Sequence, residues 1–264
     1  MERISVLRND ILVSLASAGS NWVSGEELAD LFGISRAAVG KHVRTLRKEG
    51  NIIEAVPSRG YRLISQAAPW AGDNLPRKLL KTSRLGQGKW LWLKETDSTN
   101  LVLMREALAG AEEGTVAVAR HQNQGRGSKG RSWMDAPGCL MFSVLLRPAL
   151  PAGRVEDLVL CVLQSCQKAL LDRCGTQVDI KLPNDIMLHE RKIGGVLVES
   201  MFHNNFMTWA VAGIGVNVNV PDGSLPKELL GKASSIYAET SRPSSVAALL
   251  AGILEEIEER LPAE

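Results

Sequence analysis

The sequence predicts a two-domain α+β protein, in which a small helical module with a β-hairpin precedes a larger domain built on a mixed β-sheet. Three observations support this prediction. Residues 1–65 show three helical stretches followed by a pair of short strands. Residues 66–82 hold alanine, proline, glycine and aspartate without periodicity, as a linker does. In residues 83–264 short apolar strands alternate with helical patterns, which is typical of a sheet covered by helices.

The first module is predicted to contain three helices and a hairpin. The first helix spans about residues 3–18, the second begins after Ser24, and the third runs from Ser35 to about residue 49. Residues 51–63 read as two short strands joined by a basic turn. This order of elements is that of a winged helix–turn–helix.

The third helix of this module is cationic on one face. Lys41, Arg44 and Lys48 lie at i, i+3 and i+7 and form one stripe. Such a face is often only solvated, but here a cap, a short turn and a basic wing accompany it. We therefore expect operator DNA to be bound, through Ser35, Arg36, Lys41, His42, Arg44 and Arg59. Specific recognition by so small a module would need a dimer.

The second domain is expected to alternate strands and helices along its length. Helices are predicted from Ser98 to about Ala109, over 155–174 and over 246–261. Strands are predicted over 90–93, 116–119, 139–146, 178–181, 186–188, 193–200 and 208–219. The expected layout is a mixed sheet with helices on one side.

The loop from Gln122 to Trp133 is the most unusual segment of the chain. It places three glycines, two arginines and a lysine between Gly125 and Arg131, which suits the binding of an anion, although a mobile basic loop is the simpler alternative. Its spacing approaches both a dinucleotide fingerprint and a P-loop. Both are rejected, because a turn and a strand follow where a helix is required, and Arg131 replaces the P-loop lysine.

Polar residues are predicted to gather near the start of the first helix of this domain. Ser98, Thr99 and Asn100 supply hydroxyls, an amide and free N–H groups that can bind a polar head group. Lys192 precedes two glycines, so that a cation can lie beside a closely approached ligand. The alternatives are a simple helix cap and a solvated lysine.

Three further residues are suited to a nucleotide. Asn184 and Asp185 could bind its phosphates or Mg²⁺, although they could equally form only a turn after Pro183. Asn217 has donor and acceptor edges that match adenine.

Taken in order, these motifs resemble those of one family. They are Ser35-Arg36-Ala37-Ala38-Val39-x-Lys41-His42, Asp97-Ser98-Thr99-Asn100, the loop from Gln122 to Arg131, Lys181-x-Pro183-Asn184-Asp185, Arg191 to Glu199, and Gly213-x-Gly215-x-Asn217. Over about 250 residues the arrangement resembles the bifunctional biotin–protein ligases and biotin operon repressors, whose catalytic domain has a biotin/lipoate-ligase fold.

The resemblance implies a two-step reaction, in which biotin and MgATP form biotinyl-5′-AMP and the acyl group then passes to a lysine of a biotin carboxyl carrier protein. It implies catalytic roles for Lys192, Arg126 and Arg131. Biotin would be bound by Ser98, Thr99, Asn100, Gln122, Arg126, Gly127, Ser128 and Lys192. ATP, with Mg²⁺, would be bound by Arg131, Asn184, Asp185 and Asn217. Trp133 and residues around Leu140 and Val196 would line the pocket for the biotin rings. The adenylate would act as corepressor and favour a DNA-binding homodimer.

The chain departs from the family at three places. Ser128 stands where an arginine is usual, and Leu182 stands where a tryptophan is usual. The usual carboxyl-terminal β-barrel domain is expected to be missing, because the sequence stops at Glu264. A biotin-responsive DNA-binding regulator with weak or no ligase activity therefore stays open as an alternative, as does a lipoate-type ligase of similar fold.

Overall fold

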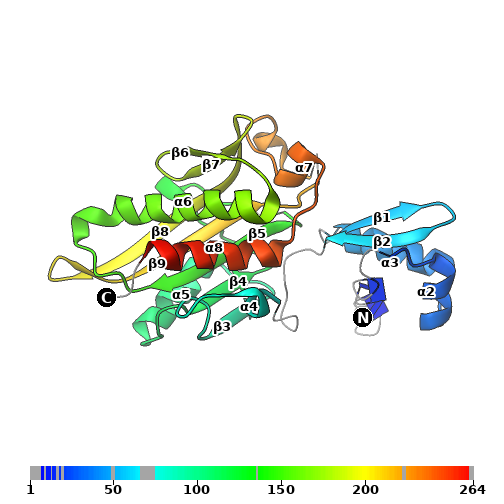
Figure 1. The fold of residues 1–264 in the computed structure, drawn as a ribbon, viewed down its shortest axis with the longest axis horizontal. Helices are drawn as coiled ribbons and strands as arrows, with labels where there is room; N and C mark the ends of the chain where they lie inside the picture. The colour runs from blue at the N-terminus through cyan, green and yellow to red at the C-terminus, as the bar shows by residue number, and fades with distance from the viewer. Residues whose placement is uncertain are drawn as a thin grey trace. The chain divides into compact units, whose positions relative to one another are not determined.

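The computed structural model describes residues 7, 8, 10–12, 14, 15, 18, 21–48, 51–65, 75–134, 136–221 and 224–261. The chain divides into two compact units, residues 1–67 and residues 68–264. Figure 1 shows the elements of both.

The first unit has the elements of a winged helix–turn–helix. Helices α2 (Gly25–Phe32) and α3 (Arg36–Lys48) precede the antiparallel strands β1 (Ile52–Val56) and β2 (Gly60–Ser65). The Ser24 hydroxyl accepts the N–H of Glu27 at 2.9 Å, and the Ser35 hydroxyl accepts that of Ala38 at 3.2 Å, so both serines cap the helices they precede. Of the first predicted helix, residues 7, 8, 10–12, 14 and 15 are helical, and the rest lies outside the described residues or is not helical.

The inner faces of the helices form the core of this unit. Val39, Val43 and Leu46 of α3 are buried against Leu28 and against residues of the first helical stretch, as the helical spacing predicted. The hairpin is tied to the segment before α2, since the backbones of Val23 and Tyr61 exchange two hydrogen bonds of 2.8 Å. The stripe of cations is thereby left on the opposite face of α3.

The second unit is built on a seven-stranded mixed sheet in the order β3-β4-β5-β9-β8-β7-β6. Only β3 and β4 pair in parallel, and the other neighbours are antiparallel. The strands are β3 (Trp90–Leu93), β4 (Val116–Ala119), β5 (Cys139–Leu146), β6 (Asp179–Lys181), β7 (Asp185–Leu188), β8 (Arg191–His203) and β9 (Phe206–Asn217). The helices are α4 (Leu75–Leu79), α5 (Thr99–Leu108), α6 (Val155–Cys174), α7 (Ile236–Thr240) and α8 (Val246–Arg260), with 3₁₀ turns at Ser128–Gly130, Ala152–Arg154 and Lys227–Leu229.

Helices cover both faces of this sheet, so the expectation of helices on one side was wrong. On one face α6 and α8 lie next to each other (Figure 1) and pack on Phe142 and Val144 of β5. On the other face Leu103 of α5 packs against Leu145 and Trp209. Strand β5 is buried at all eight positions, which is typical of a strand covered on both sides. The run of residues 139–146, which is apolar except for Ser143, carried this signal in the sequence.

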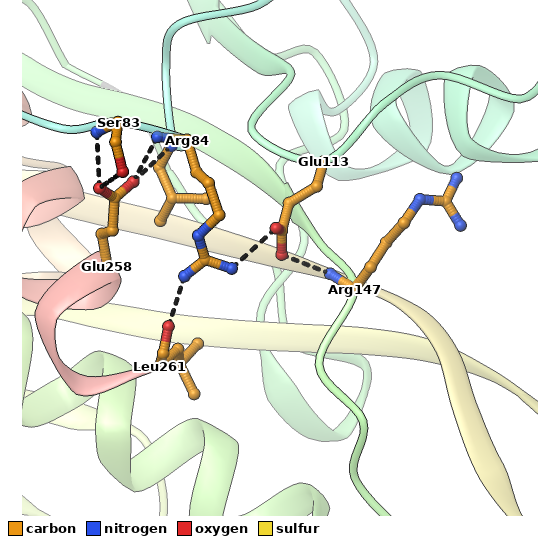
Figure 2. A network of polar contacts seen from close by, with 7 residues as sticks. Ser83, Arg84, Glu113, Arg147, Glu258 and Leu261 are labelled. Atoms are coloured by element: carbon orange, nitrogen blue, oxygen red, sulfur yellow. Dashed lines mark hydrogen bonds and ion pairs between the residues drawn. The ribbon is translucent and has the colours of Figure 1, made fainter. Parts of the chain in front are cut away.

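A polar network joins the beginning of this unit to the end of α8 (Figure 2). The Glu258 carboxylate accepts the backbone N–H groups of Ser83, Arg84 and Leu85 at 2.6, 2.8 and 2.7 Å. The Arg84 guanidinium in turn lies 2.8 Å from Glu113, whose other oxygen accepts the N–H of Arg147 at 2.9 Å. Segments more than 170 residues apart in sequence are therefore held together by one carboxylate.

None of the helices in the described ranges has the length and apolar character needed to cross a membrane.

Candidate active site

A cleft lies on the α5 side of the sheet and encloses about 440 Å³ of empty space, part of it open to solvent. It collects residues from the start of α5, the loop between β4 and β5, the turn before β7, and strands β5, β8 and β9. Its lining includes Ser98, Thr99, Asn100, Gln122, Arg126, Gly127, Trp133, Asn184, Lys192, Gly195, Leu197, Gly213 and Gly215. Most of the residues predicted to bind biotin therefore line one cavity.

The start of α5 forms a buried polar end of this cleft. Ser98 occupies the N-cap position with extended backbone, but its hydroxyl makes no capping bond within the described part of the chain. The N–H of Thr99 donates to the side-chain oxygen of Gln122 at 2.8 Å, which ties the helix to the glycine-rich loop. The Ser143 hydroxyl of β5 lies 2.6 Å from the Thr99 hydroxyl and 2.6 Å from the Asn100 side-chain oxygen, and so connects the start of α5 to the sheet.

Asn100 reaches across the sheet because β9 has a glycine beneath it. Its amide donates to Glu199 at 2.9 Å and to the Leu197 carbonyl at 3.2 Å. A Cβ on Gly213 would lie 2.1 Å from the Asn100 side-chain oxygen, so a larger residue there would displace the amide.

The glycine-rich loop doubles back on itself between β4 and β5. The N–H of Gly127 donates to the Arg131 carbonyl at 2.7 Å, and the N–H of Trp133 donates to the Gly125 carbonyl at 2.8 Å. A Cβ on Gly125 would lie 2.4 Å from the Trp133 carbonyl oxygen, which explains a glycine at that position. The loop itself contains a 3₁₀ turn, and β5 rather than an α-helix follows it, so the rejection of the dinucleotide fingerprint and the P-loop is confirmed.

Two cations enter the cleft, each beside a carboxylate. The Arg126 guanidinium lies 2.9 Å from Glu199, and the Lys192 ammonium lies 2.5 Å from Asp185. The ammonium also lies 5.7 Å from the centre of the Trp133 ring. Arg131 is exposed outside the cleft lining and donates to the Ser128 hydroxyl at 3.1 Å. An anion in the cleft would thus meet Arg126 and Lys192 first.

The backbone of β8 bulges where it carries Lys192. Residue 186 pairs with residue 194 but residue 187 pairs with residue 192, so β8 has one extra residue there. On the other side, the N–H of Lys192 donates to the Lys232 carbonyl at 2.9 Å and its carbonyl accepts the N–H of Ser234 at 2.9 Å. The lysine backbone is therefore held from two directions.

Trp133 forms one wall of the cleft by lying on a second glycine of β9. A Cβ on Gly215 would lie 2.6 Å from the indole, so only glycine allows this approach. The buried indole N–H finds no hydrogen-bond partner among the described residues and is a donor available to a ligand. Leu140, by contrast, lies in the core on the other face of the sheet, because side chains alternate along β5.

Of the residues predicted to bind the nucleotide, only Asn184 lines the cleft. Asn184 lines the cleft, accepts a hydrogen bond from Ser128 at 3.2 Å and donates to the Val196 carbonyl at 3.1 Å. Asp185 lies beside Lys192 but outside the lining. Asn217 is buried outside the lining and donates to the Ser234 carbonyl at 2.8 Å. Leu182 is 67% exposed.

Sequence reasoning missed two residues of this site, Glu199 and Ser143. Glu199 joins Arg126 to Asn100, and Ser143 joins Thr99 to Asn100. Ser143 is the one polar residue of β5, and Glu199 directly follows the apolar run Val196-Leu197-Val198, which are the signals that could have identified them.

In the first unit, Ser35, Arg36, Lys41, Arg44 and Arg59 are exposed and His42 is half-buried. Burial, followed by the charges of Arg8 and Lys41, lowers the pKa of His42, which favours a neutral imidazole. Arg47 of α3 links this helix to β1, since its guanidinium donates to the Ile53 carbonyl at 2.8 and 2.5 Å.

Comparisons with known proteins agree with this arrangement. The biotin/lipoate A/B protein ligase family matches residues 92–217, and a helix–turn–helix domain matches residues 7–62. The bifunctional ligase/repressor BirA of Bacillus subtilis is 34% identical over 257 residues, which cover 97% of this chain and 78% of that protein. The BirA protein of Escherichia coli is 32% identical over 216 residues, covering 78% and 62% of the two chains.

Solved structures show the same likeness in the catalytic unit. The biotin protein ligase from Aquifex aeolicus in complex with biotin and ATP is 32% identical, with a TM-score of 0.54 over 66% of this chain and 70% of that one. The chain therefore belongs to the biotin/lipoate A/B protein ligase family, among its bifunctional ligase/repressor members.

Proposed function

We propose that this protein activates biotin with ATP to form biotinyl-5′-AMP, transfers the biotinyl group to a lysine of a biotin carboxyl carrier protein, and represses transcription when the adenylate is bound. The observation that carries the proposal is the convergence of Arg126 and Lys192 on a cleft with a buried polar end and a tryptophan wall. This combination suits a ligand that has a polar ring, an apolar body and a carboxylate.

In the first step a biotin carboxylate oxygen attacks the α-phosphorus of ATP and pyrophosphate leaves. The two reactants are both anionic, so their approach requires positive charge in the cleft. Arg126 and Lys192 supply it, and Arg131 adds charge from the loop as the pentavalent phosphorus develops. In the second step the carrier amine attacks the acyl carbon, and AMP leaves.

The remaining site residues bind and orient the substrates. Ser98, Thr99, Asn100, Gln122 and Gly127, which line the cleft, contact the ring and chain of biotin. Ser128 lies outside the lining beside Asn184 and reaches biotin only from the loop, and the unpartnered indole N–H of Trp133 offers one more donor. Asn184, Asp185 and Asn217 bind the nucleotide. The carboxylate of Asp185 would hold Mg²⁺ together with phosphate oxygens, because magnesium prefers such ligands. The loop excludes the water that would otherwise hydrolyse the adenylate.

The first unit supplies the second activity. Arg36, Lys41, Arg44 and Arg59 are exposed cations on α3 and the wing, and Ser35 begins the helix. Within this proposal residues 1–65 bind operator DNA as one half of a homodimer and residues 83–264 form the catalytic domain. Residues 66–82 connect the two, with α4 inside this segment packed against α8 of the catalytic domain. Within this proposal the protein works in the reducing cytoplasm, which fits four cysteines that form no disulfide with one another in the described part of the chain.

The decisive experiment follows labelled ATP with biotin, with and without a carrier domain. The wild-type protein is expected to form the adenylate and then label the carrier lysine. Lys192→Ala should lower the rate of adenylate formation by about 100-fold or more, because a charge that stabilises the transition state is lost. Lys89→Ala is the control, because that lysine is exposed and forms its ion pair with Glu106 outside the cleft lining.

Three results separate the alternatives. Biotin binding without adenylate, together with ligand-dependent DNA binding, would leave a regulator that lacks ligase activity. Titration in which lipoate binds more tightly than biotin would indicate a lipoate-type ligase. A Lys192→Ala variant as active as Lys89→Ala would refute the assignment of the cleft.

A further inference from the structure

The turn that leads into Lys192 is clamped by a carboxylate that lies outside the cleft. Glu239 belongs to α7, and its side chain is 3% exposed. One of its oxygens lies 3.0 Å from Nδ1 of His189, and the other lies 2.5 Å from a guanidinium nitrogen of Arg191. His189 is in the two-residue turn between β7 and β8, and Arg191 directly precedes Lys192. The Glu239 carboxylate therefore binds residues at both ends of the turn between β7 and β8.

Burial of this carboxylate is costly unless the negative charge is compensated. Burial raises the pKa of Glu239, but hydrogen bonds from Ser234, His189 and Arg191, together with the Arg191 charge, hold it below its usual value. The carboxylate is therefore ionised at neutral pH. A buried, paired ion of this kind fixes the groups around it, and here those groups flank Lys192.

The other support of the Lys192 backbone is the segment that leads into α7, the helix that carries Glu239. The backbone of Ser234 forms a hydrogen bond with the Lys192 carbonyl, and residue 232 accepts the Lys192 N–H. The segment before α7 and the turn before β8 thus hold the bulge from two sides, and Glu239 binds His189 and Arg191 at that turn. Nothing within Lys192 itself fixes its long, flexible side chain in the cleft.

We propose that Glu239 is a positioning residue for adenylate formation. It holds Arg191 and His189 so that the Lys192 ammonium stays against Asp185 and near the Trp133 ring. The inference rests on the proposed function, since it assigns to Glu239 the placement of the charge that the reaction uses. Misplacement of a catalytic group by about 1 Å can cost on the order of 100-fold in rate.

The kinetic test compares Glu239→Gln with the wild-type protein in adenylate formation, with rates normalised to titrated biotin-binding sites. Glutamine keeps the size of the side chain but removes the charge and turns one acceptor into a donor. We expect kcat to fall at least about 10-fold, while KM for biotin and for ATP changes less than about 3-fold. Combined with Lys192→Met, the substitution should cause no further loss, because both act through the same ammonium.

Glu258→Gln is the matched control, because Glu258 is also a hydrogen-bonded carboxylate on a carboxyl-terminal helix but lies outside the cleft lining. It should lower the melting temperature without changing kcat. Equal kcat values for the two variants, or a full additional loss in the Lys192→Met background, would overturn the proposal.

Hydrogen exchange tests the clamp without any need for catalysis. In the ligand-free protein, the amides of Lys192 and Ser234 should exchange faster in Glu239→Gln than in the wild-type protein or in Glu258→Gln. Unchanged exchange would overturn the inference even if the protein proved to be an active ligase. Absence of adenylate from the wild-type protein, with faster exchange in the variant, would reject the proposed function but leave the clamp in place.

Discussion

Ser128 is the residue at which this chain differs most consequentially from the pattern of its family. Its hydroxyl donates to the side-chain oxygen of Asn184 and accepts a hydrogen bond from Arg131. The serine therefore links the loop to the turn that contains Asn184 and leads into β7, but it contributes no charge. An arginine at this position would supply a cation at the place where the phosphate of the adenylate is expected.

We predict that Ser128→Arg slows the release of biotinyl-5′-AMP by about 10-fold or more, since a charged hydrogen bond contributes about 1.5–3 kcal/mol. Release is measured by chasing labelled adenylate with unlabelled adenylate. Ser128→Ala, which only removes the hydroxyl, should retain the adenylate no better than the wild-type protein. Equal release from the arginine and alanine variants would show that charge at this position has no influence.

At the scale of elements, the Glu258 carboxylate ties helix α8 to the beginning of the catalytic unit. Glu258 accepts three backbone N–H groups from the turn at residues 83–85 and a further hydrogen bond from the Ser83 hydroxyl at 2.9 Å (Figure 2). Burial raises the pKa of Glu258, but the hydrogen bonds from Ser83, Leu85 and Arg84 outweigh it and hold the pKa below its usual value. The ionised carboxylate therefore stabilises the folded state.

We predict that Glu258→Gln lowers the free energy of unfolding by about 1–3 kcal/mol near pH 7, the cost of leaving N–H groups poorly paired. The sign follows from the lowered pKa. Stabilisation is complete above the pKa of an unfolded glutamate and is lost as the pH falls through the folded pKa. Urea unfolding at a series of pH values should show the wild-type and variant curves converging in acid. A difference that stays constant with pH would exclude this role for the charge.

At the scale of the whole molecule, the proposed function requires that events in the cleft alter the affinity for DNA. Linkage makes such an effect reciprocal, so that operator DNA must also tighten adenylate binding by the same factor. The proposal that the adenylate favours a homodimer meets this requirement, because two recognition helices bind a two-fold operator more tightly than one.

We predict that biotin and ATP together raise operator affinity at least about 10-fold and shift the protein toward a dimer in sedimentation. The joint substitution Arg36→Ala and Lys41→Ala should weaken DNA binding and reduce its salt dependence, because phosphate contacts are lost. The same variant should form the adenylate at the wild-type rate. If biotin and ATP left operator affinity unchanged, the coupling between the cleft and DNA binding would be refuted. If the two substitutions left operator affinity unchanged, the assignment of α3 as the recognition helix would be refuted.

The sequence by itself determined most of the elements. Strands β3, β4 and β5 and helix α6 have the bounds that alternation, apolar runs and helical spacing predicted, since these signals depend only on neighbours along the chain. The sequence also predicted three local features, because each needs a particular residue type at a particular backbone position. They are the glycine-rich loop, the helix start at Ser98 and the lysine before the paired glycines.

The tertiary structure decided what those residues contact. Only the register of β9 against β5 and β8 places Gly213 under Asn100 and Gly215 under Trp133, and only it brings Glu199 to Arg126. The placement of α5 on the second face of the sheet, and of Glu239 against the turn before Lys192, also arises from contacts between residues far apart in sequence. Local sequence patterns reveal the propensity and periodicity of each element. The ion pairs and the packing of side chains between distant residues form only when the chain folds, so local patterns do not predict them.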